Sequence, residues 1–99
     1  MAGFYAVADA PVLAKYDSSM KAEYSARADA LYVSVCDAEA ARTRRLDDLR
    51  MVDYAADGGV VGIEFVGASA GVDLKGIGVS AVEIEQAIRS AGLNLRVYV

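Results

Sequence analysis

The stretch "VDYAADGGVVGIEFVGAS", residues 52–69, decides the fold because it predicts a β-hairpin with one apolar and one polar face. Apolar and polar residues alternate on both sides of an Asp-Gly-Gly turn, as in two half-buried strands joined by a tight connection. A slip of one residue in the pairing mixes the faces, and a slip of two sets Asp53 against Glu64, where like charges repel. We therefore predict the register that places Asp53 opposite Gly62, which gathers these apolar side chains on one face: Val52, Tyr54, Val61, Ile63 and Phe65.

The same register defines the turn of the hairpin. It allows a two-residue Asp57-Gly58 turn, with Ala56 opposite Gly59, or a four-residue loop that starts from Ala55 opposite Val60. Asp before Gly is typical of such turns, so Asp57 and Gly58 are interpreted as structural. The glycines match neither a phosphate-binding loop nor a dinucleotide fingerprint, and no cofactor is expected.

Upstream of the hairpin, the period-two alternation predicts three more strands. Residues 20–24 and 30–35 are expected to pair as a hairpin, because only a short polar link joins them. Residues 41–46 carry charge on both faces, which is typical of an edge strand protected against aggregation. With residues 50–54 and 60–66, this gives a five-strand, mainly antiparallel meander.

Downstream, the pattern changes to one loop, one helix and a last strand. Residues 67–79 are glycine-rich and predict a loop. A helix is expected over about 80–91, because Ser80 and Glu83 form a capping box and Gly92 suits the C-terminal cap. Its apolar face, formed by Ile84, Ala87, Ile88 and Ala91, can pack on the sheet.

Residues 93–99 alternate as a final strand with three open pairing partners: the main sheet, the segment "GFYAV" at residues 3–7, or another subunit. The predicted fold class is α+β, with one helix packed on a mainly antiparallel sheet.

Composition limits the classes of protein that fit. Ninety-nine residues with 56% hydrophobic content make one small domain, residues 1–99, whose modest core suggests a homodimer or higher homo-oligomer. The net charge of -4 argues against broad binding to nucleic acid or anionic membranes. A single cysteine, no secretory signal and no bilayer-spanning run predict a cytoplasmic protein without a disulfide.

The absence of histidine excludes the most common catalytic chemistry. It removes Ser/His/Asp and Cys/His nucleophilic sites, His-ligated zinc and the usual general base near neutral pH. An enzyme would have to use carboxylates, Tyr, Lys or Arg. We expect a non-enzymatic protein and assign no catalytic residue.

Asp53 and Glu64 are the carboxylates nearest to forming a site. In the predicted register they lie on a diagonal, roughly 7 to 8 Å apart between backbone positions, where they could hold a cation or act as an acid/base pair. Asp29 is the candidate for a third ligand. The favoured interpretation is structural, because carboxylates on the polar face of a hairpin are ordinary, and no metal site is assigned.

Four arginines, Arg42, Arg44, Arg45 and Arg50, are the candidate partner-binding residues. They can serve only to keep an edge strand soluble, or they can bind an acidic partner or DNA. The acidic net charge makes DNA the least favoured of these.

Two segments, "MKAEYSARADALYVSV" and "VDYAADGGVVGIEFVGAS", resemble the paired signatures of an uncharacterised bacterial family, domain of unknown function 2283. The resemblance covers a β core of about residues 20–74, with residues 75–99 as a C-terminal extension. Ser25 and Ala55 stand where the family usually has acidic residues. The signature positions taken as structural are Asp29, Leu31, Tyr32, Asp57, Gly58, Gly62 and Ile63.

The resemblance implies a compact β-rich module and brings no established catalytic residues. Some relatives resemble antitoxin partners of small RNase-like toxins. The leading hypothesis is therefore an interaction module that self-associates and binds a protein partner, such as a toxin-like protein, through a strand edge. The alternative is a carboxylate-based metal-binding protein or hydrolase that uses Asp53 and Glu64.

Overall fold

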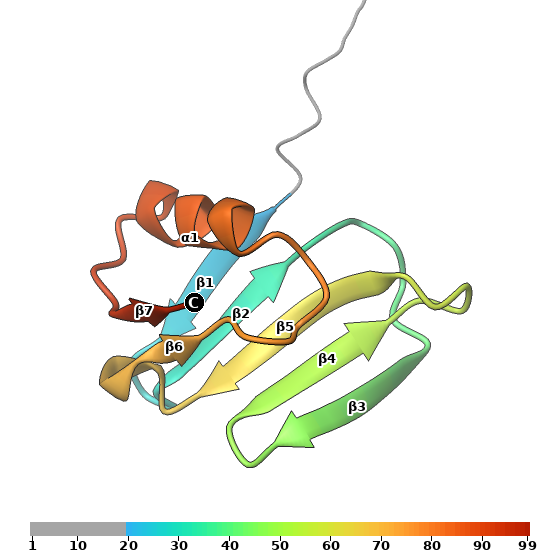
Figure 1. The fold of residues 1–99 in the computed structure, drawn as a ribbon, viewed down its shortest axis with the longest axis horizontal. Helices are drawn as coiled ribbons and strands as arrows, with labels where there is room; N and C mark the ends of the chain where they lie inside the picture. The colour runs from blue at the N-terminus through green and yellow to red at the C-terminus, as the bar shows by residue number, and fades with distance from the viewer. Residues whose placement is uncertain (1–19) are drawn as a thin grey trace, which may run out of the picture.

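The computed structural model describes residues 20–99, in which a five-stranded antiparallel sheet carries a second layer on one face (Figure 1). The segment at residues 3–7 lies outside the described residues. The main sheet contains β1 (Lys21–Ser25), β2 (Ala30–Ser34), β3 (Arg42–Asp47), β4 (Arg50–Tyr54) and β5 (Val60–Val66). The second layer contains the 3-10 helix η2 (Ala68–Ala70), β6 (Val72–Asp73), α1 (Ala81–Ser90) and β7 (Val97–Tyr98).

The predicted α+β fold, with five antiparallel strands, one helix and a C-terminal strand, is confirmed. The strands lie in the order β1-β2-β5-β4-β3. Strands β3, β4 and β5 follow one another as a meander, and the β1–β2 hairpin joins them through the pairing of β2 with β5. Strand β3 therefore lies at an edge of the sheet, as its charged pattern predicts.

The register of the central hairpin is confirmed along most of its length. Asp53 lies opposite Gly62, with Val52 opposite Ile63. The prediction is wrong at the turn, where Tyr54 pairs with Val60 across a register shift.

The turn geometry explains this shift. Ala55 N–H donates to Gly59 O at 2.8 Å, so the loop holds three residues. Gly58, at φ 92°, takes the positive-φ conformation at the end of this loop. Three-residue hairpin loops of this kind carry an adjacent bulge, which restores the register beyond it.

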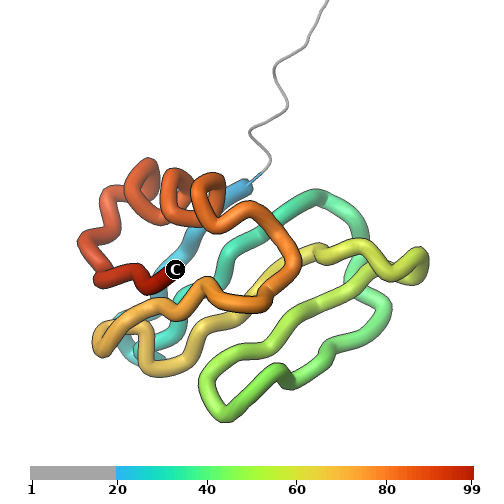
Figure 2. The backbone as a smooth tube through the Cα atoms, viewed as in Figure 1, coloured from blue at the N-terminus to red at the C-terminus, as the bar shows by residue number. Residues whose placement is uncertain are grey.

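The core lies between the sheet and the second layer. Figure 2 shows the chain from β6 through α1 to β7 passing over the same face of the sheet. Sheet residues Leu31, Val33, Val52, Ile63 and Phe65 are buried there against Val72, Leu74, Ile77, Ile84 and Ile88 of the second layer. The second layer thus supplies the apolar cover that the sheet needs.

Helix α1 follows its sequence signals. Ser80 is its N-cap and accepts a hydrogen bond from Glu83 N–H at 3.3 Å, and Gly92 follows the helix at φ 78°. Ile84, Ala87 and Ile88 are its buried residues. Within residues 20–99, no helix has the length and apolar character required to cross a membrane.

The last strand is shorter than residues 93–99 and has a different partner. Strand β7 covers only Val97–Tyr98 and pairs in parallel with β6, which lies inside the predicted loop. Leu93 and Leu95 lie outside this strand, and their apolar side chains are partly buried against the core. Of the three pairing alternatives, none describes this two-stranded ladder.

Candidate functional site

Asp53 lies at the centre of a hydroxyl network on the face of the sheet opposite the core. Tyr32 Oη donates to Asp53 Oδ2 at 2.7 Å, and Thr43 Oγ1 donates to Asp53 Oδ1 at 2.6 Å. The three side chains come from β2, β4 and β3, so the network crosses the sheet. Both carboxylate oxygens of Asp53 are therefore engaged by neighbouring hydroxyl groups.

Tyr32 reaches Asp53 by lying across Gly62 of the intervening strand β5. Any Cβ atom at position 62 would overlap the Tyr32 phenol ring, so only glycine leaves space for this path. Burial is the first cause that raises the pKa of Tyr32 to about 12, followed by its hydrogen bond to Asp53. The phenol therefore stays protonated and serves as a hydrogen-bond donor near neutral pH.

Glu64 shares this face but stands outside the network. It lies between Tyr32 of β2 and Met51 of β4. It is diagonal to Asp53, as the register predicts. As a metal or acid/base site, this pair would have to share the Asp53 oxygens with the hydroxyl groups of Tyr32 and Thr43.

Asp29 does not join these two carboxylates. It precedes Ala30, which pairs with Val66, whereas Asp53 pairs with Gly62. Val66 and Gly62 are four residues apart along β5, about 13 Å at the usual rise, and Asp29 lies one position further away. In the part of the chain from residue 20 onward, no cluster of three or more cysteine, aspartate or glutamate side chains could hold a metal ion.

Asp29 instead connects the β1–β2 turn to the chain after β5. Its carboxylate accepts hydrogen bonds from Tyr24 Oη at 2.7 Å, Ser69 Oγ at 2.7 Å and Ser69 N–H at 2.9 Å. Its backbone oxygen accepts from the amides of Gly67 and Ala68. The bond from Tyr24, followed by those from Ser69, lowers the pKa of Asp29.

The backbone of Asp29 is in the left-handed region at φ 51°, where aspartate is one of the few tolerated residues other than glycine. This conformation and the five hydrogen bonds give Asp29 a structural role.

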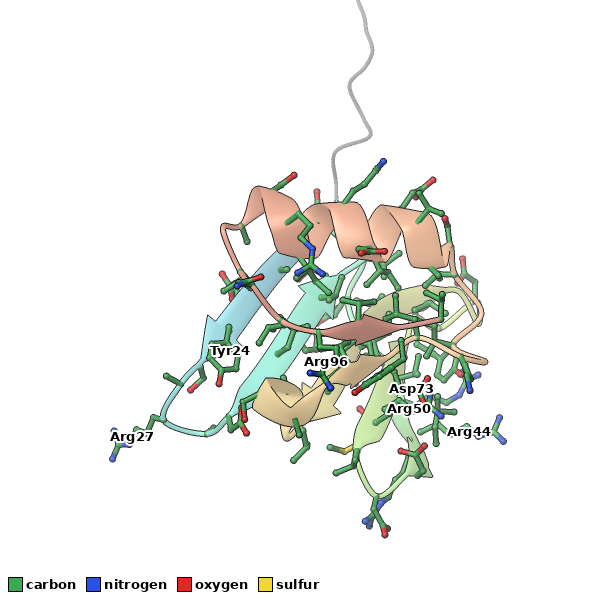
Figure 3. The ribbon with its side chains drawn as sticks, turned by 60° about the vertical axis from the view of Figure 1, so that its left-hand side comes forward. Tyr24, Arg27, Arg44, Arg50, Asp73 and Arg96 are labelled. Carbon is green, nitrogen blue, oxygen red and sulfur yellow. The ribbon has the colours of Figure 1, made fainter. Side chains whose placement is uncertain are left out.

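Arg50 is a partly buried residue that joins two parts of the fold. Its guanidinium donates to Asp47 Oδ2 from Nε at 2.9 Å and from Nη2 at 2.8 Å, and also to the backbone oxygens of Asp73 and Lys75. Figure 3 shows Arg50 beside Asp73. These contacts tie the β3–β4 turn to the end of β6 and the loop that follows it. Only 15% of the Arg50 side chain is exposed, which separates it from the other three arginines.

Arg42, Arg44 and Arg45 lie exposed along the edge strand β3. Arg42 places its guanidinium carbon 4.9 Å from the centre of the Tyr54 ring. Arg45 pairs with Asp48 at 3.0 Å. Arg44 extends away from the fold in Figure 3, and among residues 20–99 its side chain has no hydrogen bond, ion pair or ring contact.

Four partners of these groups were missed at the level of sequence. Thr43 could have been found, because the β3–β4 register places it directly opposite Asp53. Tyr24 and Ser69 around Asp29, and Asp73 near Arg50, depend on how distant segments fold together. No local sequence pattern predicts these contacts.

Comparison with known proteins supports the resemblance found in the sequence. Residues 21–69 match the model of a family described as "Protein of unknown function (DUF2283)". This segment contains the five-stranded sheet and both signatures except Met20, so the chain is similar to that family across its whole main sheet. Neither the curated proteins nor the solved structures gave a significant match.

Proposed function

We propose that this protein is a non-enzymatic binding module whose edge strand β3 accepts an extended segment of a partner protein. The supporting observation is that, among residues 20–99, β3 pairs with β4 alone, while its residues 42–45 are exposed. An edge strand presents outward-facing N–H and C=O groups that can pair with an added strand. Strand β1, at the other edge, lies beneath α1 and exposes only alternate residues.

The state of the carboxylates favours binding over catalysis. Asp53 has both oxygens engaged by Tyr32 and Thr43, and Asp29 is held in a structural network. Each of these hydrogen bonds uses one of the roughly four lone pairs of a carboxylate, so fewer of them are left to take a proton or bind a metal ion. Titration with Mg²⁺, Mn²⁺ and Ca²⁺ tests the carboxylate alternative directly, because heat of binding that Asp53→Asn removes would support it.

Amide hydrogen exchange on a complex tests the role of the β3 edge. A partner captured on the immobilised protein is purified and mixed with it again, and exchange is compared with that of the free protein. We expect slower exchange in residues 42–47 and unchanged exchange in β1, which acts as the internal control. Slowing confined to β1 or α1, or no partner retained after purification, contradicts the proposal.

An antitoxin-like role is one form of this function. Its partner would be a toxin-like protein encoded by a neighbouring gene, so co-expression of the two gene products gives a direct first test. Co-purification with the same slowing at residues 42–47 supports this form, and separate elution of the two proteins contradicts it.

A further inference from the structure

We infer that the β3 edge selects an extended peptide with acidic residues at alternate positions; this inference rests on the proposed function and names the chemistry of the partner. Arg42 lies opposite Tyr54 and Arg44 lies opposite Val52, so both arginines are on the side of the sheet that carries the core. Both are exposed. They form a two-arginine row at the outer rim of that face.

This row keeps its positive charge. The ion pairs formed by residues 20–99 join Arg45 to Asp48, Arg50 to Asp47 and Asp73, and Arg89 to Glu85, so none involves Arg42 or Arg44. The Tyr54 ring attracts Arg42 without neutralising it. Two unneutralised guanidinium groups side by side favour a partner of opposite charge.

A second copy of this strand is a poor partner. A two-fold axis through Arg44 sets that arginine against its own copy, and an axis through Thr43 sets Arg42 against Arg44 twice. Like charges directly opposite each other in a sheet are destabilising. An axis through Arg45 sets that arginine against its own copy, and an axis through Leu46 pairs Arg45 with Asp47, which already binds Arg50.

An acidic peptide matches the spacing of the row. Residues at i and i+2 of an added strand project on the same face and lie about 6.7 Å apart, as do Arg42 and Arg44. Each carboxylate would lie across from one guanidinium, within reach of a charge-assisted hydrogen bond. The partner segment therefore carries Glu or Asp at two positions separated by one residue.

Fluorescence anisotropy with labelled peptides of about ten residues tests this inference. The probe alternates Glu with Val and Thr, and the matched peptides replace Glu by Gln or by Lys. We expect the Glu peptide to bind at least tenfold more tightly than the Gln peptide in low salt, with the advantage falling as salt rises. Equal binding of the Glu and Gln peptides overturns the inference.

Variants of the protein locate the site. Arg44→Glu should weaken the Glu peptide at least tenfold and improve binding of the Lys peptide. Arg27→Glu is the matched control, because Arg27 is exposed in the β1–β2 turn and the change in charge is identical. Equal loss in both variants shows a general charge effect and overturns the inference.

Two further outcomes separate competing occupants. N-methylation of alternate amides in the Glu peptide should abolish binding, because it removes the hydrogen bonds of an added strand. Unchanged binding rules out strand addition.

The Arg44→Glu variant also tests DNA and a second copy of the chain as occupants. If the natural protein retains a DNA duplex and the variant does not, or if the natural protein is a homodimer and the variant is a monomer, the edge has another occupant and the inference is overturned. One further outcome is a captured partner that slows amide exchange at β3 and still binds the Arg44→Glu variant as tightly as the natural protein. That result supports the proposed function and overturns the inferred preference for acidic peptides.

Discussion

At the scale of single residues, Gly62 and Tyr32 form a contact that constrains both positions. The backbone of Gly62 has an ordinary φ, so the requirement for glycine comes from the Tyr32 ring that lies over it. An aromatic ring that covers a strand glycine replaces packing that the glycine cannot provide.

We predict that Gly62→Ala destabilises the protein by about 2 kcal/mol, because the added methyl group displaces the Tyr32 ring. In a Tyr32→Ala background the same change should cost at least about 1 kcal/mol less. Urea unfolding of the four proteins in this double-mutant cycle measures the difference. Additive losses would contradict the role assigned to the ring.

Asp29 gives a prediction about pH. Its pKa is lowered in the folded protein by hydrogen bonds from Tyr24 and Ser69, so its contribution to stability is complete above the pKa of the unfolded chain and disappears as pH falls through the folded pKa. Asp29→Asn keeps a side chain that tolerates φ 51° but removes the charge. We expect the variant to be less stable at pH 7 and to lose less stability between pH 5 and pH 2.

Urea unfolding across that pH range provides the measurement. Asp37→Asn is the control, because Asp37 is exposed and has no hydrogen bond or ion pair within the described residues. Parallel stability curves for the natural protein and Asp29→Asn would show that the network around Asp29 does not depend on its charge.

At the scale of elements, Arg50 joins two segments that the sequence keeps apart. It holds Asp47 at the β3–β4 turn and the backbone oxygens of Asp73 and Lys75 in the second layer. Hydrogen bonding to Asp47 is the first cause that raises the pKa of Arg50, which stays charged.

Arg50→Lys should reduce stability by about 1 to 2 kcal/mol, because an ammonium group cannot reproduce the planar fork of donors. The same change should leave binding of the acidic peptide within about twofold, since Arg50 lies outside the two-arginine row. Urea unfolding and peptide anisotropy measure the two effects. Strong loss of peptide binding without loss of stability would show that Arg50 contributes to peptide binding and not to the stability of the fold.

Strands and helix could be predicted because each is specified by its own residues. The period-two pattern found the five strands of the main sheet, and Ser80 with Glu83 and Gly92 defined α1. The predicted register at the hairpin turn was wrong by one residue. The alternation of apolar and polar residues fixes which face each side chain occupies, but it does not predict that Gly58 ends a three-residue loop.

Contacts between distant segments could not be predicted in this way. The pairing of β2 with β5 and the hydrogen bond between Asp29 and Ser69 join segments far apart in the sequence. The residues near each of these positions carry no pattern that identifies the distant partner. The two-residue strands β6 and β7 are too short for a period to be recognised, so their parallel pairing was missed. Likewise, the carboxylates were found from sequence, but the hydroxyl groups that engage them were not.

At the scale of the whole molecule, self-association stays a prediction. Light scattering should give the mass of a dimer or larger assembly, because the core of this small domain is modest and Val82 and Val99 are 65% and 74% exposed. Arg44→Glu should leave that mass unchanged, since β3 pairs poorly with itself. A monomer at every concentration would contradict self-association.

The family-matched sheet and the C-terminal layer depend on each other for a core. Residues 21–69 contain the whole main sheet, while Val72, Leu74, Ile77, Ile84 and Ile88 lie beyond the match and bury its apolar face. Without that layer, the buried residues of β2, β4 and β5 would meet water. We therefore expect a chain that ends at residue 71 to lack a cooperative unfolding transition.

A single substitution tests the same dependence in the full chain. Ile88→Ala should cost about 3 kcal/mol, because Ile88 is fully buried at the layer interface and the change leaves a cavity. Val82→Ala is the matched control on the exposed face of the same helix and should cost under about 1 kcal/mol. Urea unfolding measures both costs, and amide hydrogen exchange in β2, β4 and β5 reports on the sheet separately from α1. If Ile88→Ala left the sheet signal unchanged while α1 alone melted, the sheet would be stable without its cover, and residues 21–69 would form an independent unit.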